Sequence, residues 1–548
     1  MADALDQKKN LLFQEAGPPL PHAMESLMSY IPWFPRQQRG HVYIHLPQEE
    51  KEENKPQRCY KESRPLSAIR VDFVVDKVDA HEQPRCLRPA VFPVCIIVII
   101  TSLVVVLPLI MNYGIKLRQG QEFVDPPVPC SDQCSVTIVE SIPVNLTYPA
   151  GSPQLPSIFD SWMQLISLAQ ETIEIGAFYF TLRGEDIHFE DPSAAQGEQV
   201  FKRLMDIGSA GKVKIRIAQN LPSKTQHDQD TIDLAKSGGA EVRSLDFQRF
   251  EGAGILHTKV FIVDRKHFFV GSANMDWRSL TQVKELGAAV YNCSCLAQDI
   301  GKIFDAYWYM GAPNSTIPPV WPKEYNTAYN ATNPMSVPLN GTETQTYLAS
   351  SPPEFCPAGR SVDIDAILNI INQSREFVYI AVMDYFPSIV FSWPNKFWPV
   401  IDDALRAAAL NRRVRVRLLA SWWKHSNKDM IKYLQSLQAL NGTNRHTIIE
   451  TKLFEVPATP EQAKIPYARV NHNKYMVTDK TAYIGTSNWS GDYFVNTGGI
   501  GFVLSQNADA IRRGPMMSTQ STIEQQLKDV FDRDWNSPYA RPITDFTK

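Results

Sequence analysis

The order of helix and strand patterns after residue 150 constrains the fold most, because the same order occurs twice. Residues 159–181 combine an amphipathic helical pattern with an apolar strand, and residues 363–387 repeat this combination. An alternating strand then follows in each half, at residues 212–217 and again at residues 413–418. Strands that alternate with helices predict a mixed α/β sandwich. The fold class that we expect is therefore α/β, with an internal duplication.

The duplication predicts two similar α/β sandwich lobes, residues 152–345 and residues 346–548, with the Pro- and Asn-rich stretch 311–341 as the connection near their boundary. The composition agrees with folded lobes, since 44% hydrophobic and 21% charged residues exclude wholesale disorder and a polytopic membrane protein. The formal net charge of −3 shows no global basic excess. Any surface that binds nucleic acid would therefore be local.

An apolar segment precedes the lobes. Residues 89–111 carry no charge and are long enough to cross a bilayer as one helix. A buried core helix is the alternative, but such helices rarely stay apolar on every face. Residues 1–88 are polar and aperiodic, which predicts a disordered cytosolic tail. A span this deep in the chain is expected to be an uncleaved signal-anchor, followed by an extended, surface-lying stalk at residues 112–151.

Two patterns orient this transmembrane helix. More basic residues precede the span closely than follow it, which places the N-terminus in the cytosol under the positive-inside rule. Glycosylation sequons follow the span and none precedes it, so the large C-terminal part is expected to be lumenal. The sequons expected to carry glycans are Asn145, Asn292, Asn314, Asn330, Asn340, Asn372 and Asn441. A formal sequon at Asn488 lies inside a motif described below, where a glycan would block the cleft, and we expect it to be unused.

Two closely spaced pairs of cysteines lie on the predicted lumenal side, Cys130 with Cys134 and Cys293 with Cys295. In an oxidising compartment they predict two disulfide bonds that join the stalk to the first lobe, with their connectivity left open. Zinc is the competing interpretation, although closed zinc sites more often use a C-x2-C pair or histidines at fixed spacing. Cys356 is left over, either free or joined to another chain.

Each predicted lobe contains one copy of the same histidine motif. Both copies fit H-x-K-x4-D followed by G-[ST]-x-N, and two matches with the same trailer are far from a chance occurrence. The first copy consists of His257, Lys259, Asp264 and Asn274, and the second of His472, Lys474, Asp479 and Asn488. Residues i and i+2 of a strand project to the same face, so each histidine would lie beside its lysine. The two aspartates are expected to orient the turns that follow, with a direct catalytic role as the alternative.

Two histidines, two lysines and two asparagines at one cleft suit cleavage of a phosphodiester with no metal and no cofactor. One neutral imidazole would attack phosphorus and form a phosphohistidine, while the opposite imidazolium protonates the leaving oxygen. The lysines and asparagines would hold the equatorial oxygens of the transition state. A metal site is the alternative, but a lysine beside each histidine would repel a divalent ion. Because histidine titrates at about pH 6.5, we expect a bell-shaped rate profile in an acidic lumen.

The paired motifs resemble those of the phospholipase D superfamily, and residues 274–287 and 469–477 are similar to its vertebrate single-pass lysosomal members. The resemblance implies two phospholipase D-like lobes in a type II membrane protein that travels from the endoplasmic reticulum and Golgi to endosomes and lysosomes. Processing to a soluble lumenal form belongs to the same expectation. It further implies a 5′ to 3′ exonuclease on single-stranded DNA and RNA, and it leaves an exchange of acyl-glycerol phosphate esters open.

One family feature occurs in only one half of the chain. In that family a glutamate eleven residues after the motif asparagine commonly holds the catalytic imidazole, and Glu285 fits this place after Asn274. Gly499 occupies the corresponding place after Asn488. The resemblance therefore implies that Glu285 orients His257, which would make His257 the nucleophile.

The sequence is compatible with more than one class of substrate. A nuclease that binds single strands needs aromatic side chains for base stacking and local positive charge. The candidates are residues 178–180, Trp277, residues 422–423, Tyr493 and Phe494, of which the last two are best placed because they directly follow the second motif. A phospholipid hydrolase or transphosphatidylase and a catalytically silent membrane-anchored binding protein are the alternatives. A homodimer is left open as well.

Overall fold

The computed structural model describes residue 130 and residues 133–223, 228–392, 394–506 and 521–546. The predicted cytosolic tail, the apolar segment 89–111 and stalk residues 112–129 lie outside the described residues. Within the described part of the chain, no helix is both long enough and apolar enough to cross a membrane.

The first sheet of the described residues takes strands from before and within the predicted first lobe. In spatial order these are β1 (Ser135–Ser141), β9 (Glu285–Tyr291), β7 (His267–Gly271), β6 (Lys259–Val263), β2 (Thr172–Ala177), β4 (Lys214–Asn220) and β5 (Glu241–Leu245). Strands β2, β4 and β5 are parallel to one another, and the pairs from β2 to β6, β7, β9 and β1 are antiparallel. The sheet is therefore mixed.

The second sheet repeats this order. Its strands are β10 (Met335–Leu339), β11 (Thr342–Ser351), β22 (Gly499–Gln506), β20 (Ala482–Gly485), β19 (Lys474–Thr478), β13 (Phe377–Val382), β17 (Arg415–Ser421), β18 (Ile449–Phe454) and β23 (Ala540–Pro542), with β12 (Ser361–Val362) beside β11. The run β11-β22-β20-β19-β13-β17-β18 corresponds strand for strand to β1-β9-β7-β6-β2-β4-β5. The two halves thus share one mixed α/β topology, as the internal duplication predicts.

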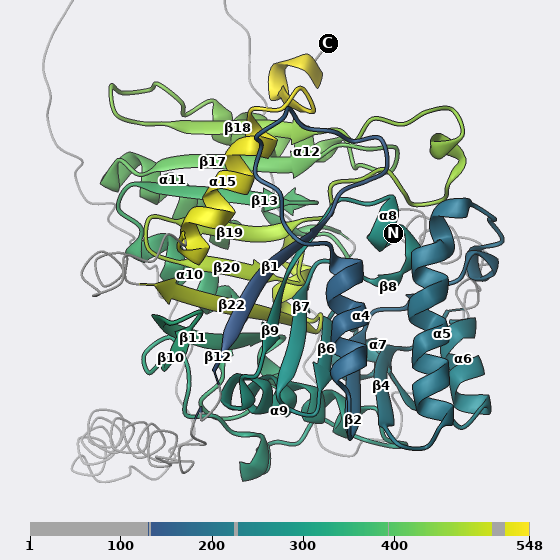
Figure 1. The fold of residues 1–548 in the computed structure, drawn as a ribbon. Coiled ribbons are helices and arrows are strands. Elements are labelled where there is room, and N and C mark those ends of the chain that lie inside the picture. Colours follow the sequence, from purple (N-terminus) through teal and green to yellow (C-terminus); the bar gives the residue numbers. More distant parts are fainter. Residues whose placement is uncertain (1–129, 131–132, 224–227, 393, 507–520, 547–548) are drawn as a thin grey trace, which may run out of the picture. The chain divides into compact units, whose positions relative to one another are not determined.

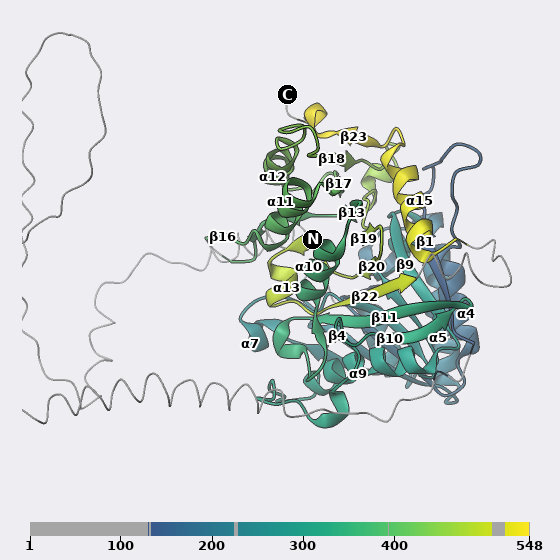
Figure 2. The same cartoon turned by 90° about the vertical axis from the view of Figure 1, so that its left-hand side faces the viewer.

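Helices cover the outer faces of both sheets (Figures 1 and 2). The longer helices are α4 (Ile158–Leu168), α5 (Ala195–Ser209), α6 (Gln229–Lys236), α9 (Ser294–Met310), α10 (Asp363–Gln373), α11 (Val400–Arg412), α12 (Asp429–Gln438) and α15 (Ile523–Trp535). Helices α4 and α5 pack on the outer face of the first sheet, and α10, α11 and α12 pack on the outer face of the second. The inner faces share one core with α9 and α15, and the rings of Phe268 and Phe502 lie 5.7 Å apart there.

The sequence explains the matching helices α4 and α10. Ser157 caps α4, because its side chain accepts a hydrogen bond from the backbone N–H of Asp160 at 3.0 Å. Apolar residues at helical spacing, such as Trp162 and Leu165, then face the first sheet. Ile367 and Ile371 do the same in α10 against the second sheet. Each helix ends a few residues before a buried strand, which gives the predicted helix–strand unit.

The stalk prediction is wrong for residues 135–141, which form a strand instead of lying on the surface. Val136 and Ile138 of β1 are buried in the core between the sheets, and Val139 is buried on the opposite face. Prolines stand on both sides of this segment, at Pro129 and Pro143, but none lies within it. The segment can therefore pair along its whole length with β9.

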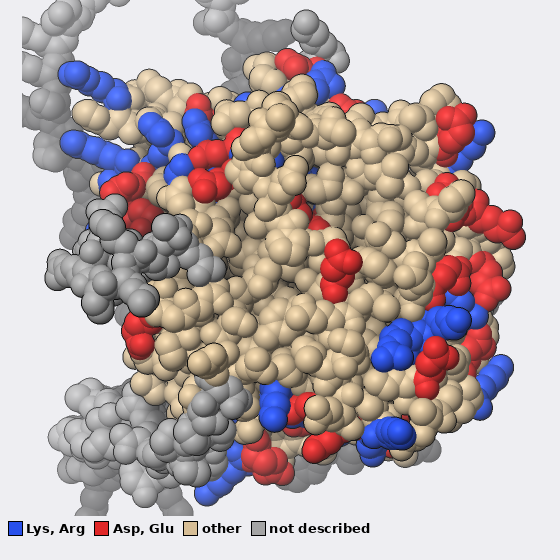
Figure 3. All heavy atoms as spheres, viewed as in Figure 1, with Lys and Arg blue, Asp and Glu red and all other residues tan. Residues whose placement is uncertain are grey.

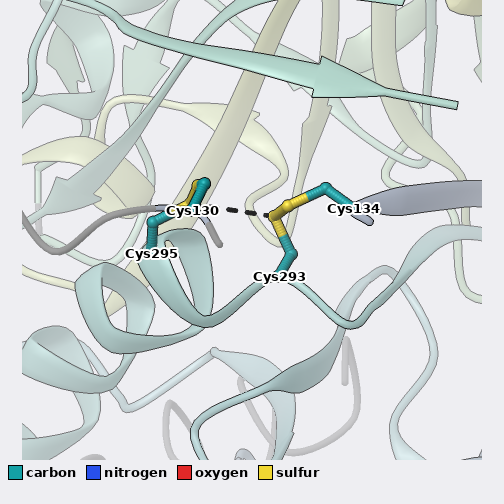
Figure 4. Close-up of side chains that lie close together, drawn as sticks. All are labelled: Cys130, Cys134, Cys293 and Cys295. Atoms are coloured by element: carbon teal, nitrogen blue, oxygen red, sulfur yellow. Dashed lines mark hydrogen bonds between the residues drawn. A yellow bond between two sulfur atoms is a disulfide. The ribbon is translucent and has the colours of Figure 1, made fainter. Parts of the chain in front are cut away.

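Two disulfide bonds tie the segment before β1 to the start of α9 (Figure 4). They join Cys130 to Cys295 and Cys134 to Cys293, which confirms two bridges between the stalk and the first lobe and settles their connectivity. Among the described residues, these cysteines are also the group close enough to share a metal ion, but their thiols are used in the bridges. Cys356 is the free cysteine of the described part, and its Sγ donates to the carbonyl of Ser350 at 3.1 Å.

The boundary between the halves lies within the connection predicted for residues 311–341 and before the predicted start of the second lobe at residue 346. Strand β10 begins at Met335 and forms an antiparallel hairpin with β11, so the end of that stretch already belongs to the second sheet. Asn340 and Gly341 form the turn between the two strands, and both have positive φ, as is typical of an Asn-Gly hairpin turn.

Candidate active site

Both histidine motifs stand at the start of a buried hairpin. Lys259 opens β6, which pairs with β7, and Lys474 opens β19, which pairs with β20. Each histidine lies two residues before its strand, at the end that faces the other half of the molecule. All four side chains are almost completely buried, with 0 to 6% of each residue exposed. The structure therefore brings the two motifs to one place.

The backbone at the start of β9 and of β22 crosses to the opposite motif. The N–H of His257 donates to the carbonyl of Gly498 at 2.8 Å, and the N–H of His472 donates to the carbonyl of Lys284, also at 2.8 Å. Gly498 and Lys284 hold equivalent places, one residue before β22 and β9. Each half of the chain therefore delivers its next residue, Gly499 or Glu285, to the other half's histidine.

Glu285 consequently holds His472 and not His257, which corrects the sequence expectation. Nδ1 of His472 lies 3.0 Å from Oε1 and 2.9 Å from Oε2 of Glu285. Two serines complete the carboxylate, because Ser272 Oγ donates to Oε2 at 2.5 Å and Ser279 Oγ donates to Oε1 at 2.9 Å. The expectation was wrong because the chain crosses to the other half within the eleven residues from Asn274 to Glu285. A carboxylate that follows the first motif in sequence therefore lies beside the histidine of the second.

His257 has a neutral acceptor instead. Its Nδ1 lies 2.9 Å from the backbone carbonyl of Thr486. A Cβ at Gly499 would lie 2.4 Å from Ser487 Oγ and 2.9 Å from Ser351 Oγ, so the two serines fill the space that a larger side chain would need. The position that corresponds to Glu285 is therefore closed to a carboxylate in this half.

The acceptors fix the same tautomer in both histidines. A carbonyl oxygen only accepts, and the Glu285 carboxylate accepts as well, so Nδ1 carries the proton in His257 and in His472. Nε2 of each neutral ring then carries the lone pair. Nε2 of His257 makes no hydrogen bond with a described residue. Both rings therefore have an Nε2 that can react. They differ in the group at Nδ1, which is a neutral carbonyl for His257 and a carboxylate for His472.

Burial governs the protonation of both histidines. It lowers the pKa of His472 to about 4, although the Glu285 carboxylate opposes the shift. It lowers the pKa of His257 well below the usual value, and Lys259 and Lys474 add to the shift through their positive charge. Both rings are thus neutral over a wide range of pH in the free site.

The two lysines have matching surroundings. Lys259 Nζ donates to the carbonyl of His257 at 2.7 Å, and Lys474 Nζ donates to the carbonyl of His472 at 2.9 Å. Burial lowers the pKa of Lys474 to about 7, against the opposing charges of Glu285 and Asp384. Burial and the charge of Lys474 lower the pKa of Lys259 well below its usual value. An anion placed between the lysines would relieve this crowding of cations.

The motif asparagines are also brought to this place, each beside a tyrosine hydroxyl. Asn274 Nδ2 donates to Tyr179 at 3.2 Å, and Asn488 Nδ2 donates to Tyr493 at 3.1 Å. The Oδ1 atom of each asparagine is buried and has no partner among the described residues. Their equivalent settings again reflect the duplication.

A cavity of about 830 Å³ opens onto this cluster, and we call it the main cavity. His472, Asn274 and Glu285 line it, together with Tyr179 and Arg278. His257 is completely buried. The rings of Phe178 and Tyr493 lie 5.3 and 5.0 Å from the ring of His257. The two histidines therefore differ in access as well as in their acceptors.

Comparison with known proteins agrees with this geometry. A family model described as "PLD3/4, PLD-like domain" matches residues 151–459. The chain is 50% identical to human "5'-3' exonuclease PLD3" over 76% of its own length and 82% of the relative's. The chain belongs to the PLD3/4 family. It is 48% identical to the PLD3 of Xenopus laevis over 88% of its length and 96% of that protein, and 43% identical to mouse "5'-3' exonuclease PLD4" over 75% and 80%.

The family model ends before the second motif, so the structure adds what that match omits. His472 and Lys474 follow residue 459, and they lie in the second sheet at the place that His257 and Lys259 hold in the first. In this PLD3/4 family chain the site is therefore composed from both halves.

Asp264 and Asp479 lie at the far end of the motif strands. The Asp264 carboxylate accepts hydrogen bonds from the backbone N–H groups of Gln170, Glu171 and Thr172 at 2.7 to 2.9 Å. Asp479 accepts two equivalent bonds from Arg375 and Glu376, at 2.9 and 3.1 Å. These contacts fix the hairpin to the loop before β2 or β13, and the structure does not bring either aspartate to the main cavity.

The stacking candidates separate in the structure. Phe494 is completely buried and stacks on Trp398, with ring centroids 5.8 Å apart, so its prediction as a platform is wrong. Tyr493 is buried beside His257, where its hydroxyl accepts from Asn488. Trp277 is also in the core. Phe178, Tyr179 and Trp423 line the main cavity.

Several site residues escaped the sequence analysis. Ser272 and Ser279 hold Glu285, Thr486 holds His257, and Asp384 lies beside Asn488, whose Nδ2 is 3.3 Å from Asp384 Oδ2. Burial raises the pKa of Asp384 to about 6. Aligning the two halves could have identified Asp384. It lies two residues after β13, and Tyr179, which lines the main cavity, lies two residues after β2.

The predicted glycosylation sites differ in exposure. Asn145, Asn292, Asn314, Asn372 and Asn441 are exposed. Asn330 and Asn340 are half-buried, and Asn340 donates to the carbonyl of Val136 at 2.7 Å and accepts from its N–H at 3.0 Å. A glycan on Asn340 would replace the first of these bonds. Asn488 is completely buried.

Proposed function

We propose that this protein is a lumenal phosphodiesterase that degrades single-stranded DNA and RNA in the 5′ to 3′ direction through a phosphohistidine intermediate. The observation that carries the proposal is the pair of buried histidines from opposite halves, each with Nδ1 on an acceptor and Nε2 available. The printed names of the PLD3 and PLD4 relatives support the nuclease activity and its direction.

His472 is the nucleophile in this proposal. Its Nε2 lone pair attacks phosphorus, a nitrogen–phosphorus bond forms, and the bond from phosphorus to the leaving oxygen breaks. The imidazole becomes positively charged, and the Glu285 carboxylate on Nδ1 stabilises that charge. The neutral carbonyl of Thr486 offers His257 less stabilisation. This difference supports the second motif as the source of the nucleophile, opposite to the assignment that the sequence suggested.

His257 supplies the proton. It donates from Nε2 to the leaving oxygen in the first step, and in the second step it takes a proton from the water that attacks the phosphohistidine. The nitrogen–phosphorus bond then breaks and both rings return to their first state. A bound phosphodiester anion would raise the pKa of His257, because it offsets the charges of Lys259 and Lys474 that lower it in the free site. Substrate binding thus prepares the acid.

The lysines and asparagines of both motifs bind the phosphate in this proposal. Lys259 and Lys474 supply positive charge from both sides, and Asn274 and Asn488 supply polar groups at the same place. On the face shown in Figure 3, Lys and Arg are interspersed with Asp and Glu near the margins and form no broad basic surface.

We place the enzyme on the lumenal side of endolysosomal membranes, reached through the endoplasmic reticulum and Golgi. The apolar segment 89–111 is its proposed signal-anchor, and a soluble lysosomal form could arise by cleavage after it. The five exposed sequons agree with a glycosylated lumenal part. The two disulfides agree with an oxidising compartment.

The test uses the full-length protein in detergent at about pH 5 with a chelator, because this pH lies between the pKa values of His472 and Lys474. Single-stranded oligonucleotides with free or blocked 5′ ends are offered beside a phospholipid. The wild type should shorten only oligonucleotides with a free 5′ end, and His257→Ala or His472→Ala should abolish this activity. His446→Ala, at an exposed histidine remote from both motifs in sequence, is the control. Lipid turnover without oligonucleotide cleavage would replace the nuclease by a phospholipid hydrolase or transphosphatidylase.

A further inference from the structure

A second cavity adjoins the main cavity. It has a volume of about 500 Å³, and we call it the side cavity. Trp423, Pro466 and Tyr467 line both cavities, so these residues form the boundary between them. Both volumes lie within the range of about 300–1,000 Å³ typical of small-molecule sites. Each cavity is therefore large enough for a nucleotide.

Three aromatic rings gather at this boundary, and we call Trp423, His425 and Tyr467 the rim cluster. The rings of His425 and Tyr467 are stacked with centroids 4.9 Å apart, and the ring of Trp423 lies edge-on to His425 at 4.7 Å. Tyr467 is 36% exposed, so its side chain is partly accessible at the boundary of the two cavities. Its φ of 53° lies in the left-handed region, where a bulky residue is rare.

The rim cluster is held from both halves of the molecule. Arg278 of the first half donates from a guanidinium nitrogen to the carbonyl of Pro466 at 2.5 Å, which fixes the backbone beside Tyr467. Trp423 packs against Val283 of the first half and Val470 of the second. The backbone N–H of Trp423 also donates to Ser426 Oγ at 3.1 Å. The rings are therefore presented by fixed backbone rather than by a loose loop.

Charge distinguishes the two cavities. The main cavity carries Glu185, Asp186 and Asp228. Arg183 there is shared among four carboxylates, those of Glu185, Asp186, Asp230 and Asp233. The side cavity instead carries Lys424 and Lys464, both exposed, while its Glu455 is paired with Arg541 at 3.0 Å. The exposed lysines of the side cavity therefore attract a polyanionic strand.

We propose that the rim cluster is a base-stacking site that leads a single-stranded nucleic acid from the main cavity into the side cavity, where the second nucleotide of the strand binds. This inference rests on the proposed nuclease function and extends it to a subsite. The terminal nucleotide occupies the main cavity beside His472. A base of the following nucleotide stacks on Tyr467 or Trp423, and Lys424 and Lys464 attract its phosphate.

The test compares two substrates of the full-length protein. One is a single-stranded oligonucleotide, and the other is bis(4-nitrophenyl) phosphate, a small diester with no second nucleotide. Tyr467→Ala and Trp423→Ala should each lower the ratio of oligonucleotide to small-diester kcat/KM by about 5- to 100-fold, which corresponds to the loss of one stacked base. Trp423→Phe keeps a ring and should recover most of the ratio if Trp423→Ala proves unstable.

Charge is tested in the same way. The double variant Lys424→Glu, Lys464→Glu should have a lower ratio than the wild type, and this difference should be larger at low salt. The oligonucleotide reaction of the variant should depend less on salt than that of the wild type. Lys396→Glu and Phe397→Ala are the matched controls, because both side chains are exposed on the short strand β16 (Lys396–Phe397) and line neither cavity. Both controls should keep the ratio of the wild type.

The outcomes separate the subsite from the activity. If the wild type degrades the oligonucleotide and Tyr467→Ala, Trp423→Ala and the double lysine variant all keep its ratio, the subsite is refuted and the nuclease function stands. If the wild type cleaves only the small diester, the nuclease function itself fails and the subsite fails with it. A lower ratio of oligonucleotide to small-diester kcat/KM in the rim variants, with both controls unchanged, supports the subsite.

Discussion

At the scale of single residues, Glu285 makes the two histidines unequal. Its carboxylate receives the Nδ1–H of His472 and one hydroxyl from each of Ser272 and Ser279. A buried carboxylate with three donors is a rigid acceptor, and it stabilises an imidazolium far better than a carbonyl does. The charge of the intermediate should therefore develop on His472.

Glu285→Gln tests this residue directly. The amide nitrogen of glutamine can donate to Nδ1 of His472, which moves the ring proton to Nε2 and removes the nucleophilic lone pair. We expect kcat/KM to fall by about 10²- to 10⁴-fold with little change in the thermal unfolding midpoint. The control is Asp363→Asn. Burial raises the pKa of Asp363 to about 7, so this carboxyl is already neutral in an acidic assay and should tolerate the amide. Equal losses in both variants would argue against a specific role of Glu285.

The pH dependence follows from the free site, because kcat/KM reports the ionisation of the free enzyme. Below about pH 4, protonation of His472 removes the nucleophile, so the rate falls on the acidic side. As the pH rises through about 7, Lys474 loses its charge and binds phosphate less well. The low pKa of Lys259 acts in the same direction. We expect a maximum of kcat/KM between these limits, measured with the small diester. A rate that increases steadily from pH 5 to pH 8 would contradict this assignment of charges.

At the scale of elements, the motif hairpin links the site to the fold. The lysine lies at one end of the first strand of the hairpin and the aspartate follows its other end. The H-x-K-x4-D pattern therefore spans one strand, from the site to the loop before the neighbouring strand β2 or β13. Asp264 accepts three backbone N–H groups and Asp479 accepts two. Both aspartates serve the position of the strand.

Asp264→Ala should therefore change stability and not chemistry. Loss of three hydrogen bonds to a carboxylate should lower the free energy of unfolding by about 2–4 kcal/mol, with a smaller effect for Asp479→Ala. Denaturant unfolding measures both effects. The kcat of the folded variants should stay within about threefold of the wild type, since neither side chain contacts the site. A large loss of kcat in Asp264→Ala at unchanged stability would assign the aspartate a chemical role.

Local patterns were sufficient to predict these elements. Residues 259–263 are a lysine followed by four apolar residues, and a turn-forming aspartate comes directly after them. This pattern predicts a short buried strand, and the second strand of the hairpin begins a few residues later. The helix–strand units of α4 and α10 were predicted for the same reason. Strand β1 was not, because its partner β9 lies about 150 residues away in the chain and its flanking prolines suggested irregular structure.

At the scale of the whole molecule, the relation between the two halves decides which residues meet. The duplication predicted one composite site, but the partner of Glu285 depends on the backbone bridges at Lys284 and Gly498. No local pattern records a bridge between residues 187 positions apart, such as Glu285 and His472. The burial of Phe494 and the boundary role of Tyr467 are likewise set by packing between distant segments. These parts of the site therefore required the structure.

The central claim is that one site, shared by both halves, uses His472 as nucleophile and His257 as acid and base. A nucleotide 4-nitrophenyl phosphodiester tests it most directly, because its leaving group departs without protonation. In His257→Asn the first step should proceed and the second should stall, so a covalent nucleotide adduct should accumulate and map by mass spectrometry to His472. His472→Asn should form no adduct. An adduct on His257 in the His472→Asn protein, with none on His472 in the His257→Asn protein, would contradict the account.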